Sequence, residues 1–175
     1  MKSGFYNIPL TGLKEGSHIY DFEINDDFFC SFEESEIKDG RINAEVTLIK
    51  RSAHMELNIR LAGSVSVSCD RCLENYLQGI DAENHIFVKY GDQWAEVDDD
   101  VLMIHYGESE LELSQLLYEF VHLALPIQRV HPDNRDGKST CDQEMLEKLE
   151  KYTGENNIEI DSRWKDLDIL RGNTN

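Results

Sequence analysis

The sequence predicts an α+β fold, in which an antiparallel, strongly twisted sheet or half-barrel over about residues 5–106 is followed by helices. Apolar and polar residues alternate through most of the first two thirds of the chain, which is the period of half-buried strands. The apolar spacing then becomes helical over residues 113–125, and we expect this helix to pack on the sheet. A chain of 175 residues fits one domain, which we place at 1–171, with a β-rich part at 1–106 and a helical part at 111–171.

Short connections between the strand-like segments favour an antiparallel meander. The expected strands lie at residues 5–10, 18–24, 42–48, 55–61, 65–67, 76–90 and 101–106. Residues 26–32 form a compact apolar segment, which we interpret as one helical turn with Cys30 as a small core residue. Residues 96–100 are acidic and are expected to form a loop.

The first predicted helix carries one apolar stripe and ends near Ala124, because the residue before Pro126 avoids the α region. Its stripe consists of Leu113, Leu116, Leu117, Phe120, Val121 and Ala124. A second, smaller helix is expected to begin at Cys141–Asp142. Its predicted buried stripe is Met145, Leu146, Leu149 and Tyr152. A last short helix is expected near residues 161–170.

The net charge bears on the class of partner. Lys and Arg total 17 and Asp and Glu total 35, which gives −18 at pH 7. Direct RNA contact is disfavoured by this charge, because binding to phosphates depends on Lys and Arg, whereas encounters with basic partners are accelerated. No apolar run approaches a membrane span and no signal peptide follows Met1, so we expect a cytoplasmic protein without membrane contact. No catalytic motif is recognisable, so we expect no enzymatic activity.

Two cysteines, Cys69 and Cys72, stand in a C-x-x-C motif on a tight turn after a strand-like run. This spacing lets two thiolates reach one tetrahedral centre. His131 and Cys141 follow about 60 residues later and complete a possible set of four zinc ligands. The alternatives are a pair of reduced thiols on a tight turn and, less favoured because the motif does not open a helix, a redox dithiol.

Three motifs in this order resemble the YceD family. They are Cys69-Asp70-Arg71-Cys72-Leu73-Glu74, the segment from Leu113 to Pro126 with its ending Leu123-Ala124-Leu125-Pro126, and Asp161-Ser162-Arg163-Trp164 followed by Leu167. The resemblance implies a ribosome-biogenesis factor that supports accumulation of the large-subunit ribosomal RNA. Many members carry a cysteine-rich tail, often with a second C-x-x-C, whereas this chain has only His131 and Cys141 in that region.

Charge and resemblance together predict a factor that binds a basic large-subunit ribosomal protein or a pre-ribosomal particle. The alternative is a zinc-dependent RNA-binding module that contacts precursor rRNA through the C-x-x-C hairpin. The candidate partner-binding residues are Arg71, Asp70, Glu74, Asp98, Asp99 and Asp100. A local ion pair of Arg71 with Asp70 or Glu74, and a merely solvated acidic face at 98–100, are the simpler readings.

Overall fold

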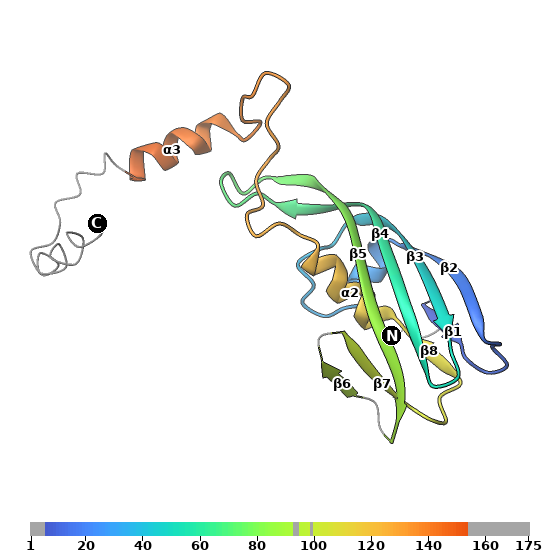
Figure 1. Ribbon diagram of the computed structural model, residues 1–175. Helices are drawn as coiled ribbons and strands as arrows, with labels where there is room; N and C mark the ends of the chain where they lie inside the picture. Colours follow the sequence, from blue (N-terminus) through green and yellow to red (C-terminus); the bar gives the residue numbers. More distant parts are fainter. Residues whose placement is uncertain (1–5, 93–94, 99, 154–175) are drawn as a thin grey trace, which may run out of the picture.

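The structure, a computed structural model, describes residues 6–92, 95–98 and 100–153. The largest part of the fold is one twisted sheet of six strands (Figure 1). Its strands lie side by side in the order β2 (Gly16–Ile24), β3 (Gly40–Lys50), β4 (His54–Ser68), β5 (Asn75–Gly91), β7 (Val101–His105) and β6 (Ala95–Asp98). Because β2 and β6 end this order without pairing with each other, the sheet is open, and the predicted α+β class with a twisted sheet is confirmed.

The alternation in the sequence sets which face of the sheet is buried. Val46 of β3 lies opposite Ile59 of β4, and both side chains are almost completely buried. Leu57 of β4 lies opposite the buried Ile86 of β5, so the same face continues across three strands. The intervening residues, such as Glu45, point to the opposite, solvated face.

The chain runs through residues 54–68 as one strand of 15 residues, although the sequence predicted two separate strands there. Gly63 allows this continuity. A Cβ at Gly63 would lie 2.2 Å from the carbonyl oxygen of Arg41 and 2.7 Å from the Cα of Ile42. Only glycine permits the backbones of β3 and β4 to approach so closely at this position.

The end of the sheet departs from the predicted meander. β7 pairs with β5 in parallel, with Phe87 opposite Val101, and β6 pairs antiparallel with β7 at the edge. The expectation of purely antiparallel pairing was therefore wrong here, and residues 95–98 form a strand where an acidic loop was expected. Strand β1 (Asn7–Pro9) pairs with β8 (Glu110–Glu112) in a separate two-stranded sheet.

Two helices accompany the sheet. Helix α1 (Asp26–Cys30) begins where the side chain of Asn25 accepts a hydrogen bond from the Phe28 N–H at 3.2 Å. It buries Phe28 and Phe29, but Cys30 is exposed, so its assignment to the core was wrong. A helix this short has only one buried side, and Cys30 lies outside it.

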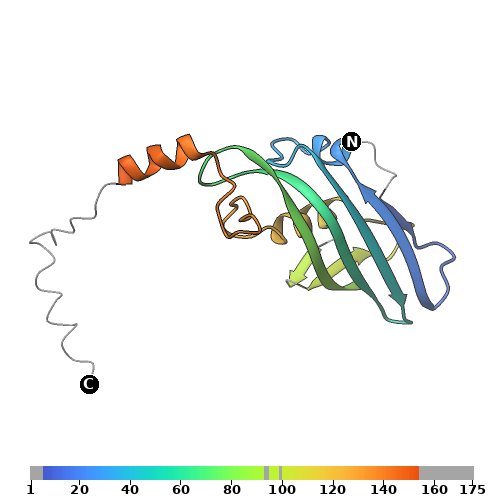
Figure 2. The same ribbon diagram turned by 90° about the horizontal axis from the view of Figure 1, so that it is seen from above.

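Helix α2 (Ser114–Leu123) lies against one face of the sheet and leaves the other face open (Figure 2). Leu117, Phe120 and Val121 are buried in the main core, as the predicted stripe requires. The ring of Tyr118 stacks on Phe32 with a centroid distance of 4.1 Å, which ties α2 to the segment after α1.

Helix α3 (Gln143–Thr153) extends away from the sheet in both views (Figures 1 and 2). It has no buried residue; Met145 and Leu146 are half-buried, whereas Leu149 and Tyr152 are 41% and 84% exposed. The prediction of a fully buried stripe was therefore wrong for Leu149 and Tyr152, because no described element lies beside that part of α3. The helix expected at 161–170 lies outside the described residues. Within those residues, no helix combines the length and the apolarity that a membrane span requires.

Candidate metal centre

The connection between β4 and β5 presents two sulfur atoms from one turn. The N–H of Cys69 donates to the carbonyl oxygen of Glu74 at 2.9 Å, and the N–H of Leu73 donates to the carbonyl oxygen of Cys69 at 2.9 Å. Leu73 takes a left-handed backbone conformation, with φ of 64°, which closes the turn. The N–H of Arg71 donates to the Sγ of Cys69 at 3.4 Å, a contact that favours a thiolate at this sulfur.

A small hairpin folded from residues 131–141 supplies the other two donor atoms. The Oδ1 of Asn134 accepts hydrogen bonds from the N–H groups of Asp136 and Lys138, each at 2.9 Å. Asp133 and Ser139 form a β-bridge beneath this turn. The segment from His131 to Cys141 therefore folds back on itself. As a result, the Nδ1 of His131 lies 3.7 Å from the Sγ of Cys141.

The four predicted ligands come together in one cluster. The Sγ atoms of Cys69 and Cys141 are 3.7 Å apart, and the Sγ of Cys72 lies 3.4 Å from the Nδ1 of His131. One donor atom from each of the four residues lies within 4.8 Å of all the others. The four side chains come from two segments about 60 residues apart in the sequence, and folding of the chain brings them together.

This arrangement fits a tetrahedral zinc ion. With Zn–S bonds of about 2.3 Å, tetrahedral geometry separates two sulfurs by about 3.8 Å, close to the observed distance. The three cysteines are at most 4% exposed and form a cluster separate from the main core. Cys69, Cys72, His131 and Cys141 would hold the ion with no open coordination position. Such a closed site stabilises structure and does not activate water.

The protonation of the thiols is consistent with this reading. Burial raises the pKa of Cys69, but hydrogen bonds from the backbone N–H groups of Cys72 and Arg71 and from His131 outweigh it and lower the pKa to about 6. Burial raises the pKa of Cys72, and the neighbouring Cys69 and Cys141 also raise it. The cluster thus favours one thiolate before any metal binds, and a divalent cation would favour the others.

With the fold and the cluster established, comparison with known proteins identifies the family. The family model described as "Large ribosomal RNA subunit accumulation protein YceD" matches residues 57–171, well over half of the chain. The chain belongs to the YceD family. The resemblance read from the sequence is thereby confirmed, and the family name implies a role in accumulation of the large ribosomal subunit RNA. No curated protein and no solved structure gave a match.

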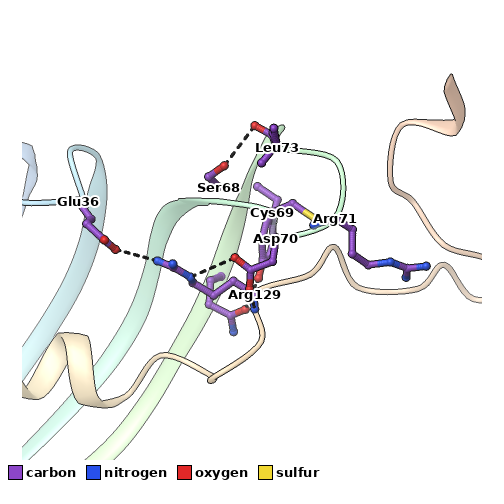
Figure 3. Close-up of polar contacts among 9 residues, drawn as sticks. Glu36, Ser68, Cys69, Asp70, Arg71, Leu73 and Arg129 are labelled. Carbon is purple, nitrogen blue, oxygen red and sulfur yellow. Dashed lines mark hydrogen bonds and ion pairs between the residues drawn. The ribbon is translucent and has the colours of Figure 1, made fainter. Parts of the chain in front are cut away.

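In this YceD protein, one arginine fixes the cysteine turn to the rest of the fold (Figure 3). The N–H of Arg129 donates to the Oδ2 of Asp70 at 2.7 Å, and the N–H of Asp70 donates to the carbonyl oxygen of Arg129 at 2.7 Å. The guanidinium of Arg129 also donates to the Oε2 of Glu36 at 3.0 Å, and this hydrogen bond raises the pKa of Arg129. Three segments, around residues 36, 70 and 129, are thus held together beside the cluster.

The predicted partner-binding residues of this YceD protein are not gathered in one place. Arg71 and Glu74 are exposed on the cysteine turn, and Arg71 points away from Asp70 (Figure 3). No described carboxylate lies within 4.0 Å of Arg71. Its neighbour Asp70 forms an ion pair with Arg129 instead. Asp98 and Asp100 are exposed at the β6–β7 turn, and Asp99 lies outside the described residues. Partner binding by these residues remains a prediction.

Sequence reasoning missed Glu36 and Arg129. Neither stands in a motif, and their contact with each other spans 93 residues of chain. The sequence gives no local signal for such a pair, because ion pairs between distant loops depend on the final path of the backbone.

Proposed function

We propose that this YceD protein acts in the cytoplasm without catalysing a reaction, and that it supports accumulation of large-subunit rRNA by binding a basic large-subunit ribosomal protein or an assembly intermediate. The net charge of −18 carries the proposal. The family match supports the connection with the large ribosomal subunit. A strongly negative protein attracts a basic ribosomal protein and keeps it from binding other polyanions until it meets its rRNA.

The distribution of cations supports a protein partner over bare RNA. Four of the six arginines in the described residues have a carboxylate within 4.0 Å. These pairs are Arg41–Glu23, Arg51–Glu56, Arg60–Glu83 and Arg129–Glu36. An arginine already paired with a carboxylate contributes less to phosphate binding, since that pair must first be broken.

The metal cluster has a supporting role in this proposal. A structural zinc would fix the turn at Cys69–Cys72 to the hairpin at 131–141, and therefore fix the shape of this end of the molecule. A rigid surface binds its partner without the entropy cost of ordering a loop.

An affinity capture from native cytosol tests the proposal, with RNase-treated and untreated samples compared and the zinc content of the bait measured. We expect one basic large-subunit protein to be captured in both samples at physiological salt. Capture of no basic ribosomal protein above a neutral control protein would overturn the proposal.

The alternative, a zinc-dependent RNA-binding module, is favoured by one observation. Arg71 is exposed at the cysteine turn and lacks an ion-pair partner among the described residues. In that case all ribosomal partners would be lost on RNase treatment. RNA binding would weaken with a log–log salt slope of about 0.7 to 0.9 per phosphate contacted, and the substitution Arg71→Glu would abolish it.

A further inference from the structure

Strand β2 forms a long open edge of the sheet. Its nine residues pair with β3 on one side, and no described strand pairs with its other side (Figure 1, where β2 is the blue strand at the right-hand edge). A free edge exposes backbone N–H and C=O groups that a further strand can complete by hydrogen bonding.

The charges on the open face are unbalanced at this edge. Asp21 of β2, Glu45 of β3, Arg60 of β4 and Glu83 of β5 lie opposite one another in a continuous row across four strands. Arg60 stands between two of the carboxylates and lies 4.0 Å from Glu83. Asp21 has only Glu45 beside it in the row, and like charges directly opposite each other destabilise a sheet. A cation on the outer side of β2 would relieve this repulsion.

We propose that the β2 edge accepts an extended, basic segment of a partner protein as an additional strand. Lysine or arginine at alternate positions of that segment would point to the same face as Asp21 and continue the charge row. A second copy of this chain is the less suitable occupant. The sequence of β2 holds Asp21 and Glu23 but no Lys or Arg, so two such edges would repel each other.

This inference rests on the proposed function, because it assigns a surface to the same basic partner. The part of β5 before residue 87 offers a weaker candidate, because β7 pairs only with residues 87–91 and no described strand pairs with the earlier part on the side away from β4. Along β5, Glu83 already has Arg60 as a neighbour, and Asp81 lies opposite the neutral Ala62. The unrelieved repulsion at Asp21 is therefore what selects β2.

The experiment uses the full chain and a fluorescein-labelled peptide, as long as β2, in which lysine and threonine alternate. We expect binding in fluorescence anisotropy at about 0.15 M salt, and slower hydrogen exchange of the amides of residues 16–24 when the peptide is present. A peptide of the same composition with its lysines in one block is expected to bind more weakly, because only alternation places every lysine on one face.

The matched variants are Asp21→Lys and Asp81→Lys. Each reverses the charge of one exposed aspartate, and both aspartates lie on the open face of the sheet. Asp21→Lys is expected to weaken peptide binding about fivefold, whereas Asp81→Lys has little effect. Asp21→Lys is also expected to raise the unfolding temperature, because it replaces the repulsion with Glu45 by attraction, so weaker binding cannot be attributed to unfolding. Equal weakening by both variants, exclusive weakening by Asp81→Lys, no protection of residues 16–24, or protection through concentration-dependent dimers would each overturn the proposal.

The two proposals fail in distinguishable ways. If wild-type protein captures a basic large-subunit protein and Asp21→Lys captures it equally well, the proposed function stands and the β2 edge is wrong. If no such protein is captured but the alternating peptide protects β2, the edge is a basic-strand site whose partner is not a large-subunit protein.

Discussion

Asp70 and Arg129 hold each other through the backbone and the side chain. The N–H of each residue donates to an oxygen of the other at 2.7 Å, and the guanidinium Nε of Arg129 lies 3.8 Å from the Oδ1 of Asp70. Asp70 stands between the two cysteines of the turn, and Arg129 stands two residues before His131. This reciprocal contact therefore joins the two halves of the candidate metal centre independently of any metal.

The substitution Asp70→Ala should loosen this junction. It removes the acceptor of the Arg129 N–H, which we expect to lower the free energy of unfolding by about 1 to 2 kcal/mol and to weaken zinc binding several-fold. Urea unfolding and competition with a zinc-binding dye measure the two effects. Glu74→Ala is the control, since Glu74 is exposed on the same turn. An equal effect of both variants would refute the assigned role of Asp70.

Removal of one ligand should abolish metal binding without unfolding the sheet. We expect Cys141→Ser to lose stoichiometric zinc and to lower the unfolding temperature, because the cluster loses one of its four donors. Cys30→Ser is the matched control, since Cys30 is exposed and lies outside the cluster. Far-UV circular dichroism is expected to stay sheet-like in both variants, because the main core does not include the cysteines. Retention of zinc by Cys141→Ser would show that the assigned ligand set is wrong.

Metal retention should depend on pH in a defined direction. The pKa of Cys69 is lowered from 9.0 to about 6, so folding favours its thiolate. In the metal-free protein this contribution to stability is complete above about pH 9 and is lost as the pH falls to about 6. We expect zinc to be held at neutral pH and released towards about pH 5, where protons displace it from thiolate and imidazole. Zinc content after gel filtration across this range tests the expectation, and full retention at about pH 5 would contradict it.

The close approach of β3 and β4 makes Gly63 sensitive to any side chain. Gly63→Ala places a Cβ 2.2 Å from the carbonyl oxygen of Arg41, and we expect a loss of about 1 to 3 kcal/mol in the free energy of unfolding. Gly79→Ala is the control on the adjacent strand, because a Cβ there meets no atom within 4 Å. Chemical denaturation of the two variants gives the comparison. Equal stabilities would mean that the strands can separate at Gly63 without cost.

The sequence predicted those features that depend on local period and spacing. The alternation over residues 42–48 and 55–61 located paired strands, and the C-x-x-C turn located two of the clustered donors. Burial on one face repeats every two residues in a strand, so such patterns are readable without knowledge of the fold. The same holds for the stripe of α2, which packs as its helical period requires.

Features that depend on distant contacts could not be predicted. The parallel pairing of Phe87 with Val101 depends on a chain reversal through β6, whose acidic sequence resembles a loop. Leu149 belongs to an apolar pattern with helical period in α3, but the period alone does not show whether another element covers that side of the helix. The role of Arg129 depends on Asp70 and Glu36, which are 59 and 93 residues away.

The pairing of β1 with β8 has a consequence for the order of events during synthesis. Ile8 and Leu111 face each other in this pair, and both are buried. A nascent chain translated at about 5 to 20 residues per second reaches β8 roughly 5 to 20 seconds after β1. The strands β2 to β5 pair with sequence neighbours and can assemble during this interval, whereas β1 must wait for its partner to leave the ribosome. Pairing of β1 with β8 is thus a late step, which can occur only after all strands of the six-stranded sheet have been translated.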